Sequence, residues 1–160
     1  MKQMLSYAAH LPTVHFAAGE IIVREGESSG PLWVLESGTL EIRKGNVVVN
    51  IVTRAGALIG EISLLLGVAC SATVEAVTPC VLRCALDGRA LLASNPQVLA
   101  LVAVELAERL HCMTTYFADL KHQYADIPGL NMVPDVLGQI AERPLAPLKA
   151  GSARDPDPDY

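Results

Sequence analysis

Aromatic side chains are scarce in this sequence, in which Phe, Trp and Tyr together account for 4% of 160 residues. Hydrophobic residues nevertheless make up 51%, so a buried core must consist mainly of aliphatic side chains. A chain of this length can bury a core of ordinary domain size. The composition therefore favours one aliphatic domain with a short appendage.

Long apolar runs are also missing. No uninterrupted run reaches the roughly 18 residues that a membrane-spanning helix requires. Residues 1–7 contain too short an apolar region for a secretory signal peptide. We therefore expect a cytoplasmic protein without a membrane partner.

An excess of basic side chains is absent as well. Twelve Lys and Arg stand against 17 Asp and Glu, for a formal net charge of -5. Nucleic-acid binding normally requires a basic surface, so no nucleic-acid partner is expected. The C-terminal 35 residues, where a DNA-reading domain could follow, hold three basic and six acidic side chains.

Motifs for catalysis and metal binding are lacking. The spacing suggests no Ser/His/Asp or Cys/His arrangement and no P-loop, so we predict no enzyme and no catalytic residue. The four cysteines, at 70, 80, 84 and 112, form no Cys-x-x-Cys pair. We interpret them as small buried hydrophobic residues, and we predict no metal site and no resident cofactor.

Short strand-like segments separated by glycine turns dominate the first half of the chain. We predict a short helix over 2–10, ended by Leu11-Pro12. About eight strands follow, a number typical of a rolled or jelly-roll β domain. They are expected at 14–16, 21–24, 32–37, 39–44, 47–52, just before Gly60, at 71–77 and at 79–86. The predicted fold class is mainly β, an eight-stranded β-roll with flanking helices over 1–93.

A long helix is predicted over 94–125. Asp87 can cap a short helix before it, and Ser94-Asn95-Pro96 supplies a cap and a first-turn proline for the long one. Apolar residues then alternate at spacings of four and three, which is the pattern of a coiled-coil seam. The seam consists of Leu99, Ala103, Leu106, Leu110, Met113, Phe117, Leu120 and Tyr124. It predicts a homodimer; the alternative is a monomer whose helix packs on its own barrel.

Past Asp126 the composition changes. A short helix is expected over 133–142, and the Pro-rich remainder up to Tyr160 is expected to be disordered. Residues 126–160 thus form a third segment after the β-roll and the long helix.

The most informative stretch runs from Leu58 to Val77. A strand end breaks at Gly60, an apolar turn continues to Leu66, and an alternating strand resumes at Ser71 after Gly67. Backbone N–H groups at the start of such a turn attract anions, phosphate above all. A carboxylate beside an anion site makes sense if Glu61 accepts hydrogen bonds from hydroxyl groups of the same ligand.

These residues resemble the phosphate-binding cassette of cyclic-nucleotide-binding domains, as in catabolite activator protein and the regulatory subunits of protein kinase A. The resemblance rests on Gly60-Glu61, on 62–65 and on Ser71-Ala72-Thr73-Val74. It extends over about residues 10–124 through Phe16-x-x-Gly-Glu-x-Ile, Glu25-Gly26 and Leu32-x-Val-x-x-Ser-Gly. The turn glycines, including Gly38, are interpreted as scaffold, because tight turns require positive φ.

The resemblance implies a set of ligand-binding residues. Its glutamate, here Glu61, binds the ribose hydroxyl, while backbone amides and a small residue bind the cyclic phosphate. The implied positions are Gly60, Glu61, Ile62, Ser63, Cys70, Ser71 and Ala72, with Met113 and Thr114 on the long helix facing the base. The family's phosphate-binding arginine falls at Cys70, and a thiol cannot form the forked charged pair of a guanidinium.

Three interpretations follow. The first is a regulatory module that senses a cyclic nucleotide (cyclic AMP or cyclic GMP) or a related small anion and relays the signal through the long helix to an unidentified protein partner. The second is a degenerate module that acts in dimerisation or protein interaction. The third makes Cys70 a redox sensor, because amides at a helix start can lower the pKa of a thiol.

Overall fold

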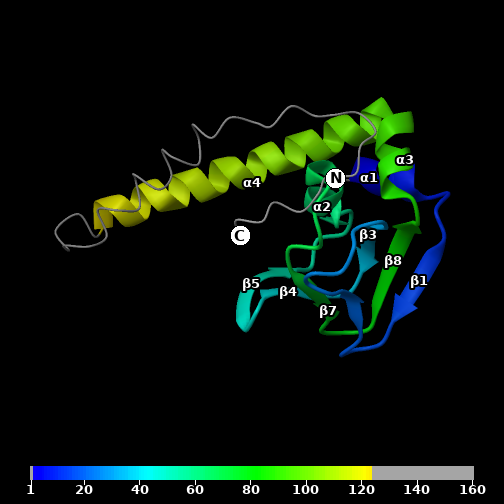
Figure 1. The fold of residues 1–160 in the computed structure, drawn as a ribbon, viewed down its shortest axis with the longest axis horizontal. Helices are drawn as coiled ribbons and strands as arrows, with labels where there is room; N and C mark the ends of the chain where they lie inside the picture. Colours follow the sequence, from blue (N-terminus) through cyan, green and yellow to red (C-terminus); the bar gives the residue numbers. More distant parts are fainter. Residues whose placement is uncertain (1, 124–160) are drawn as a thin grey trace. The chain divides into compact units, whose positions relative to one another are not determined.

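The computed structural model describes residues 2–123 (Figure 1). The predictions for Tyr124, for a short helix at 133–142 and for a disordered tail lie outside the described residues. The chain divides into two units, with the boundary after Val104.

Within residues 2–123, eight strands form two antiparallel sheets of four strands each. One sheet has the order β1-β8-β3-β6 and the other β2-β7-β4-β5. The predicted fold class, a mainly β roll followed by a long helix, is confirmed. The strands are β1 (Thr13–Phe16), β2 (Ile21–Val23), β3 (Leu32–Ser37), β4 (Leu40–Lys44), β5 (Val47–Val52), β6 (Leu58–Ile59), β7 (Thr73–Ala76) and β8 (Cys80–Ala85).

Consecutive strands alternate between the two sheets, except in the β4–β5 hairpin. Alternation along the chain makes both sheets contribute to one core. Its buried members come from both sheets and from the segment before β6: Leu35, Leu40, Ala57, Ile59, Val74, Ala76, Cys80 and Leu82. The core is aliphatic apart from half-buried Phe16 and Trp33, whose rings pack edge to face at 5.6 Å between centroids.

Two of the sheet-to-sheet crossings lie side by side. The passage from β3 to β4 meets the passage from β7 to β8: the Val77 N–H donates to the Thr39 carbonyl at 2.8 Å, and the Thr39 N–H donates to Thr78 Oγ1 at 3.0 Å. Gly38 has φ +106°, and a Cβ there would lie 2.5 Å from Cys80 Sγ and 2.7 Å from the Pro79 carbonyl oxygen. The interpretation of this glycine as scaffold is confirmed.

In the described part of the chain, four helices accompany the sheets: α1 (Lys2–Ala8), α2 (Glu61–Leu66), α3 (Gly88–Ser94) and α4 (Pro96–Gln123). The predicted caps are confirmed, since Asp87 Oδ1 accepts from the Ala90 N–H at 2.8 Å and Asn95 Oδ1 accepts from the Val98 N–H at 3.2 Å. Val98 and Val102, in the first turns of α4, are buried within the first unit.

No single helix among residues 2–123 is long and apolar enough to cross a membrane, although the bent pair Gly88–Ser94 and Pro96–Asp119 meets the length and composition criteria jointly.

The cysteines do not share one environment. Cys80 and Cys84 are buried on the inner side of β8, as predicted. Cys112 is exposed on α4 and Cys70 is half-buried, so the prediction that all four are buried hydrophobic residues is wrong for these two. Helical periodicity alone did not reveal which helix face position 112 occupies.

Replacing Gly38 with Ala should strongly destabilise the fold. The positive φ costs about 1–2 kcal/mol for a residue with a Cβ, and the overlap with Cys80 and the Pro79 carbonyl adds about 1–3 kcal/mol. Gly19→Ala is the matched control, because Gly19 also has a positive φ, +87°, but open space around it. Urea unfolding should show a larger decrease in the free energy of unfolding for Gly38→Ala than for Gly19→Ala. Equal decreases would contradict the packing argument.

Candidate functional site

The α2 turn is bounded by two glycines in the left-handed conformation. Gly60 precedes it with φ +95°, and Gly67 follows it with φ +69°. A Cβ on Gly60 would lie 2.9 Å from the Pro31 carbonyl oxygen, so this position requires glycine both for its φ and for space. At the other end the Gly67 N–H donates to the Ser63 carbonyl at 2.9 Å.

This turn buries two polar side chains. Glu61 is 4% exposed and Ser63 is 3% exposed, whereas Ile62 between them is 39% exposed. A buried carboxylate is costly unless it is hydrogen-bonded. Glu61 is therefore not a solvated surface charge.

The second part of the predicted site, 70–72, is fixed by a distant loop. The Cys70 N–H donates to the Glu27 carbonyl at 2.8 Å, and the Gly26 N–H donates to the Cys70 carbonyl at 2.8 Å. Both backbone groups of Cys70 are therefore paired with the loop 24–27. Ser71 is exposed and Ala72 is half-buried.

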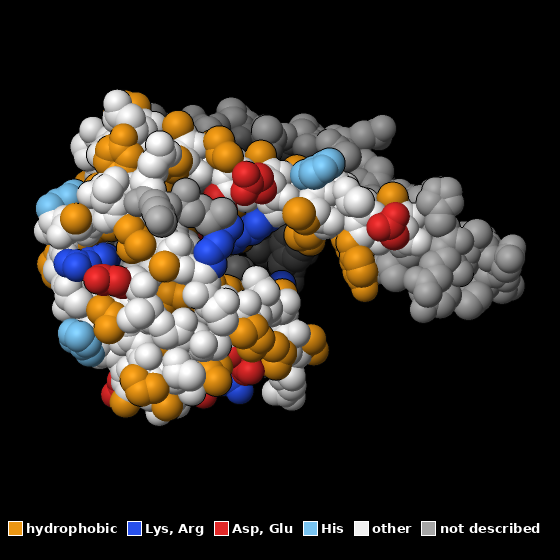
Figure 2. Space-filling view, turned by 180° about the vertical axis from the view of Figure 1, so that it is seen from behind, with side chains coloured by type: hydrophobic (Ala, Val, Ile, Leu, Met, Phe, Trp, Pro, Cys, Tyr) orange, Lys and Arg blue, Asp and Glu red, His pale blue; other side chains and the backbone are white. Residues whose placement is uncertain are grey.

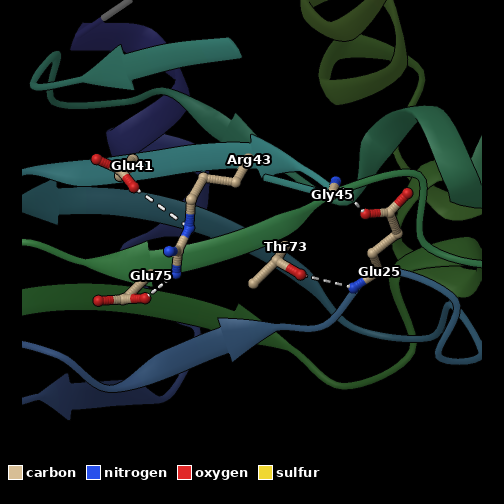
Figure 3. Close-up of polar contacts among 6 residues, drawn as sticks. All are labelled: Glu25, Glu41, Arg43, Gly45, Thr73 and Glu75. Carbon is tan, nitrogen blue, oxygen red and sulfur yellow. Dashed lines mark hydrogen bonds and ion pairs between the residues drawn. The ribbon is translucent and has the colours of Figure 1, made fainter. Parts of the chain in front are cut away.

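Glu25 connects this loop to two further elements (Figure 3). Its N–H donates to Thr73 Oγ1 at 3.1 Å, and its carboxylate Oε2 accepts from the Gly45 N–H at 2.8 Å. Gly45 lies in the β4–β5 turn and Thr73 begins β7. On the neighbouring part of the sheet, the Arg43 guanidinium lies between the carboxylates of Glu41 and Glu75.

The Cys70 thiol is not activated. Burial, together with the nearby negative charge of Glu27, raises the pKa of the Cys70 thiol above its ordinary value, and a backbone hydrogen bond opposes this shift only in part. The expectation of a lowered pKa is therefore wrong. The physical reason is that partial desolvation and a carboxylate both disfavour the thiolate.

The end of the α2 turn contacts α3. Arg89 Nη2 donates to the Leu64 carbonyl at 3.0 Å. A Cβ on Gly88 would lie 2.5 Å from Leu64 Cδ1 and 2.8 Å from Leu32 Cβ. The turn is thus in close contact with the start of α3, which leads into α4.

The residues predicted to face the base, Met113 and Thr114, lie on α4 in the second unit, which begins at Glu105. Met113 is 56% exposed. The Thr114 hydroxyl donates to carbonyls of its own helix, at 3.0 Å from Leu110 and 2.9 Å from His111. Their role toward a ligand stays a prediction.

The pocket found among the described residues lies apart from this site, and these residues offer no metal cluster. An open pocket of about 500 Å³ includes none of the predicted residues; it is lined by His15, Phe16, Gly19, Glu20, Ile21 and Arg24. Within 2–123, no group of three or more His, Cys, Asp or Glu side chains is arranged to hold a metal ion.

Sequence reasoning missed three contributors: Glu25, Glu27 and Arg89. Glu25 enters the sequence analysis only within the motif Glu25-Gly26, and Glu27 and Arg89 do not enter it. Their long-range hydrogen bonds join residues 20 to 48 positions apart in the chain, so no local pattern could indicate them.

The family model for the cyclic nucleotide-binding domain matches residues 13–105. This range covers more than half of the chain and includes both parts of the site. The chain belongs to this family.

Solved structures of the family align with most of the chain. The structure of Sp-2Cl-cAMPS bound to PKAR CBD2 is 25% identical with a TM-score of 0.54, covering 69% of this chain and 71% of that one. The catabolite activator protein of Thermus thermophilus is 24% identical with a TM-score of 0.61, covering 76% and 60%. The regulatory subunit of a cAMP-independent protein kinase A from Trypanosoma brucei is 25% identical with a TM-score of 0.55, covering 64% and 41%.

The Cys70 thiol should react slowly with iodoacetamide at neutral pH, because a raised pKa lowers the fraction of thiolate. In a Cys112→Ser background, the alkylation rate should rise with pH through a midpoint above that of a free cysteine peptide. Glu27→Gln removes the adjacent charge and should lower this midpoint. Rapid labelling of Cys70 at neutral pH would instead restore the redox interpretation.

Proposed function

We propose that this chain is a regulatory module that binds a cyclic nucleotide, cyclic AMP or cyclic GMP, or a related small anion. The observation that supports this most directly is the α2 turn, in which Gly60 and Gly67 hold a buried Glu61 at the position of the family's ribose-binding glutamate. Ligand contacts are proposed at Gly60, Glu61, Ile62, Ser63, Cys70, Ser71 and Ala72. We propose no catalytic role, and we place the protein in the cytoplasm.

The absent arginine should weaken binding of a phosphate. Loss of one partner from a buried charged pair costs about 2–5 kcal/mol, or roughly 30-fold to several-thousand-fold in affinity. Two guanidinium groups near the candidate site, on the loop 24–27 and on α3, already have partners. Arg24 Nε lies 3.9 Å from Glu27 Oε1, and Arg89 Nη2 donates to the Leu64 carbonyl. Backbone amides of the α2 turn and the Ser71 hydroxyl are the remaining proposed donors.

The proposed signal passes from the α2 turn to α3. Gly88 packs against Leu64, and Arg89 donates to the Leu64 carbonyl, so a displacement of α2 by a ligand must change contacts of α3. The Asn95 N–H donates to the Leu91 carbonyl and the Leu99 N–H to the Asn95 carbonyl, both at 3.1 Å, which joins α3 to α4. A ligand shifts such an equilibrium only if it binds two arrangements with different affinity.

We further propose that α4 pairs with the same helix of a second copy. Hydrophobic side chains lie at the surface along this helix (Figure 2). On the predicted seam, Leu99 is 41%, Leu110 63% and Met113 56% exposed. A second helix would cover these side chains by knobs-into-holes packing, and the dimer would present two modules to an effector protein.

Cys70 supports a second candidate function, a degenerate module that dimerises or binds proteins without a cyclic nucleotide. A thiol next to the Glu27 carboxylate offers no charge complement to a phosphate. One structure similar to this chain is that of a regulatory subunit described as cAMP-independent.

Calorimetric titration with cyclic AMP and cyclic GMP separates the two functions. We expect Cys70→Arg to bind at least about 30-fold more tightly than the wild type, because the guanidinium would face the phosphate with Glu27 as its neighbour. Glu61→Gln in the same background should weaken binding by removing the proposed acceptor for the ribose hydroxyl. If neither the wild type nor Cys70→Arg binds, the nucleotide assignment is wrong and the degenerate module remains.

Sedimentation velocity tests the proposed dimer. Leu110→Glu places a charge on the seam and should convert dimers to monomers, because burying an unpaired carboxylate is costly. Val104→Glu is the matched control: Val104 is also aliphatic and 55% exposed on α4, but lies outside the seam. An unchanged sedimentation coefficient for Leu110→Glu, or an equal change in the control, would refute the seam.

A further inference from the structure

The regular pairing of β2 with β7 stops short of the candidate site. It runs through Ile21 opposite Glu75 and Val23 opposite Val74, with a register shift between the two pairs. Beyond it, two backbone hydrogen bonds, from Gly26 to Cys70 and from Cys70 to Glu27, join the extensions of the two strands. The segment that holds Cys70 therefore depends on the position of the loop 24–27.

Glu25 lies at the gap between the ladder and this isolated pair. Its N–H donates to the side-chain Oγ1 of Thr73, and its carboxylate accepts from the Gly45 N–H (Figure 3). Thr73 is itself paired with Arg43 of β4. One residue thus joins the end of β2, the start of β7 and the β4–β5 turn.

We infer that Glu25 is a positioning residue of the candidate site. Its two hydrogen bonds hold the loop 24–27 against Cys70, so that residues 70–72 keep their place beside the α2 turn without direct contact between Glu25 and a ligand. The β4–β5 turn thereby becomes part of the support of the site. The relevance of this support to binding rests on the proposed function.

A positioning role differs from a general contribution to stability. Glu25 and Gly45 are both exposed, and exposed hydrogen bonds exchange readily with water, so their loss changes the free energy of unfolding little. The same bonds determine how often the short loop opens, because such segments open locally without global unfolding.

Amide hydrogen exchange of the ligand-free full chain tests this inference. Glu25→Ala should lower the protection of the Gly26 and Cys70 amides roughly 2- to 10-fold, the range that one hydrogen bond supports. Thr73→Val keeps the side-chain shape and removes the hydroxyl. It should lower the exchange protection of the same two amides. Glu25→Gln retains an oxygen acceptor for the Gly45 N–H and should restore protection.

The matched control is Glu20→Ala. Glu20 is an exposed glutamate whose Oε2 likewise accepts from a backbone N–H, that of Ala17 at 2.6 Å, in the β1–β2 turn. Its loss should leave the amides of Gly26 and Cys70 unchanged. The inference is overturned if Glu25→Ala leaves these amides protected as in the wild type, or if they exchange in the wild type as fast as in an unstructured peptide.

Calorimetry with cyclic AMP distinguishes this inference from the proposed function. In the Cys70→Arg background, Glu25→Ala should weaken binding, and unchanged affinity beside a loss of amide protection would overturn the positioning role. If Cys70→Arg itself binds no nucleotide, the proposed ligand fails, and the exchange measurement alone decides whether Glu25 positions the 70–72 segment.

Discussion

The two sheets depend on the place where the chain crosses between them beside β8. The Thr39 backbone and residues 77–78 are hydrogen-bonded to each other, and Gly38 lies so close to Cys80 that no Cβ fits. Two crossings that exchange hydrogen bonds fix the start of β4 relative to the start of β8. Because strands alternate between the sheets, this junction determines which apolar faces meet in the core.

The candidate site uses the same kind of junction elsewhere in the fold. The connections 24–31 and 60–72 also pass from one sheet to the other. Backbone groups in such passages lack ladder partners and need others. The backbone groups of Cys70 find these partners in the other connection, at the Gly26 N–H and the Glu27 carbonyl. The α2 turn is bounded by a glycine at each end. The candidate site thus lies where the sheet ladders end.

Sequence was a good guide to whatever is decided locally. Alternating apolar residues and glycine turns predicted the strands, and the cap at Asp87 followed from one side chain and the residues after it. Long-range contacts decided the rest. The pKa of Cys70 is set by burial and by Glu27, 43 positions away, and the connections made by Glu25 join three separate segments. Local pattern therefore predicted the glycine breaks on either side of α2, but not the electrostatic surroundings of Cys70.

The loop holds position 70 through backbone atoms alone, since the two hydrogen bonds at Cys70 use its N–H and its carbonyl. These two hydrogen bonds therefore do not depend on which side chain stands at position 70. Under the proposed function, the charge of this side chain and that of Glu27 would together determine how an anion binds: a guanidinium would pair with both the carboxylate and a phosphate, whereas a thiol would leave the carboxylate opposing the phosphate. On this proposal the scaffold of the site and its preference for a charged ligand are separable, and one substitution at position 70 would alter the second while leaving the first intact.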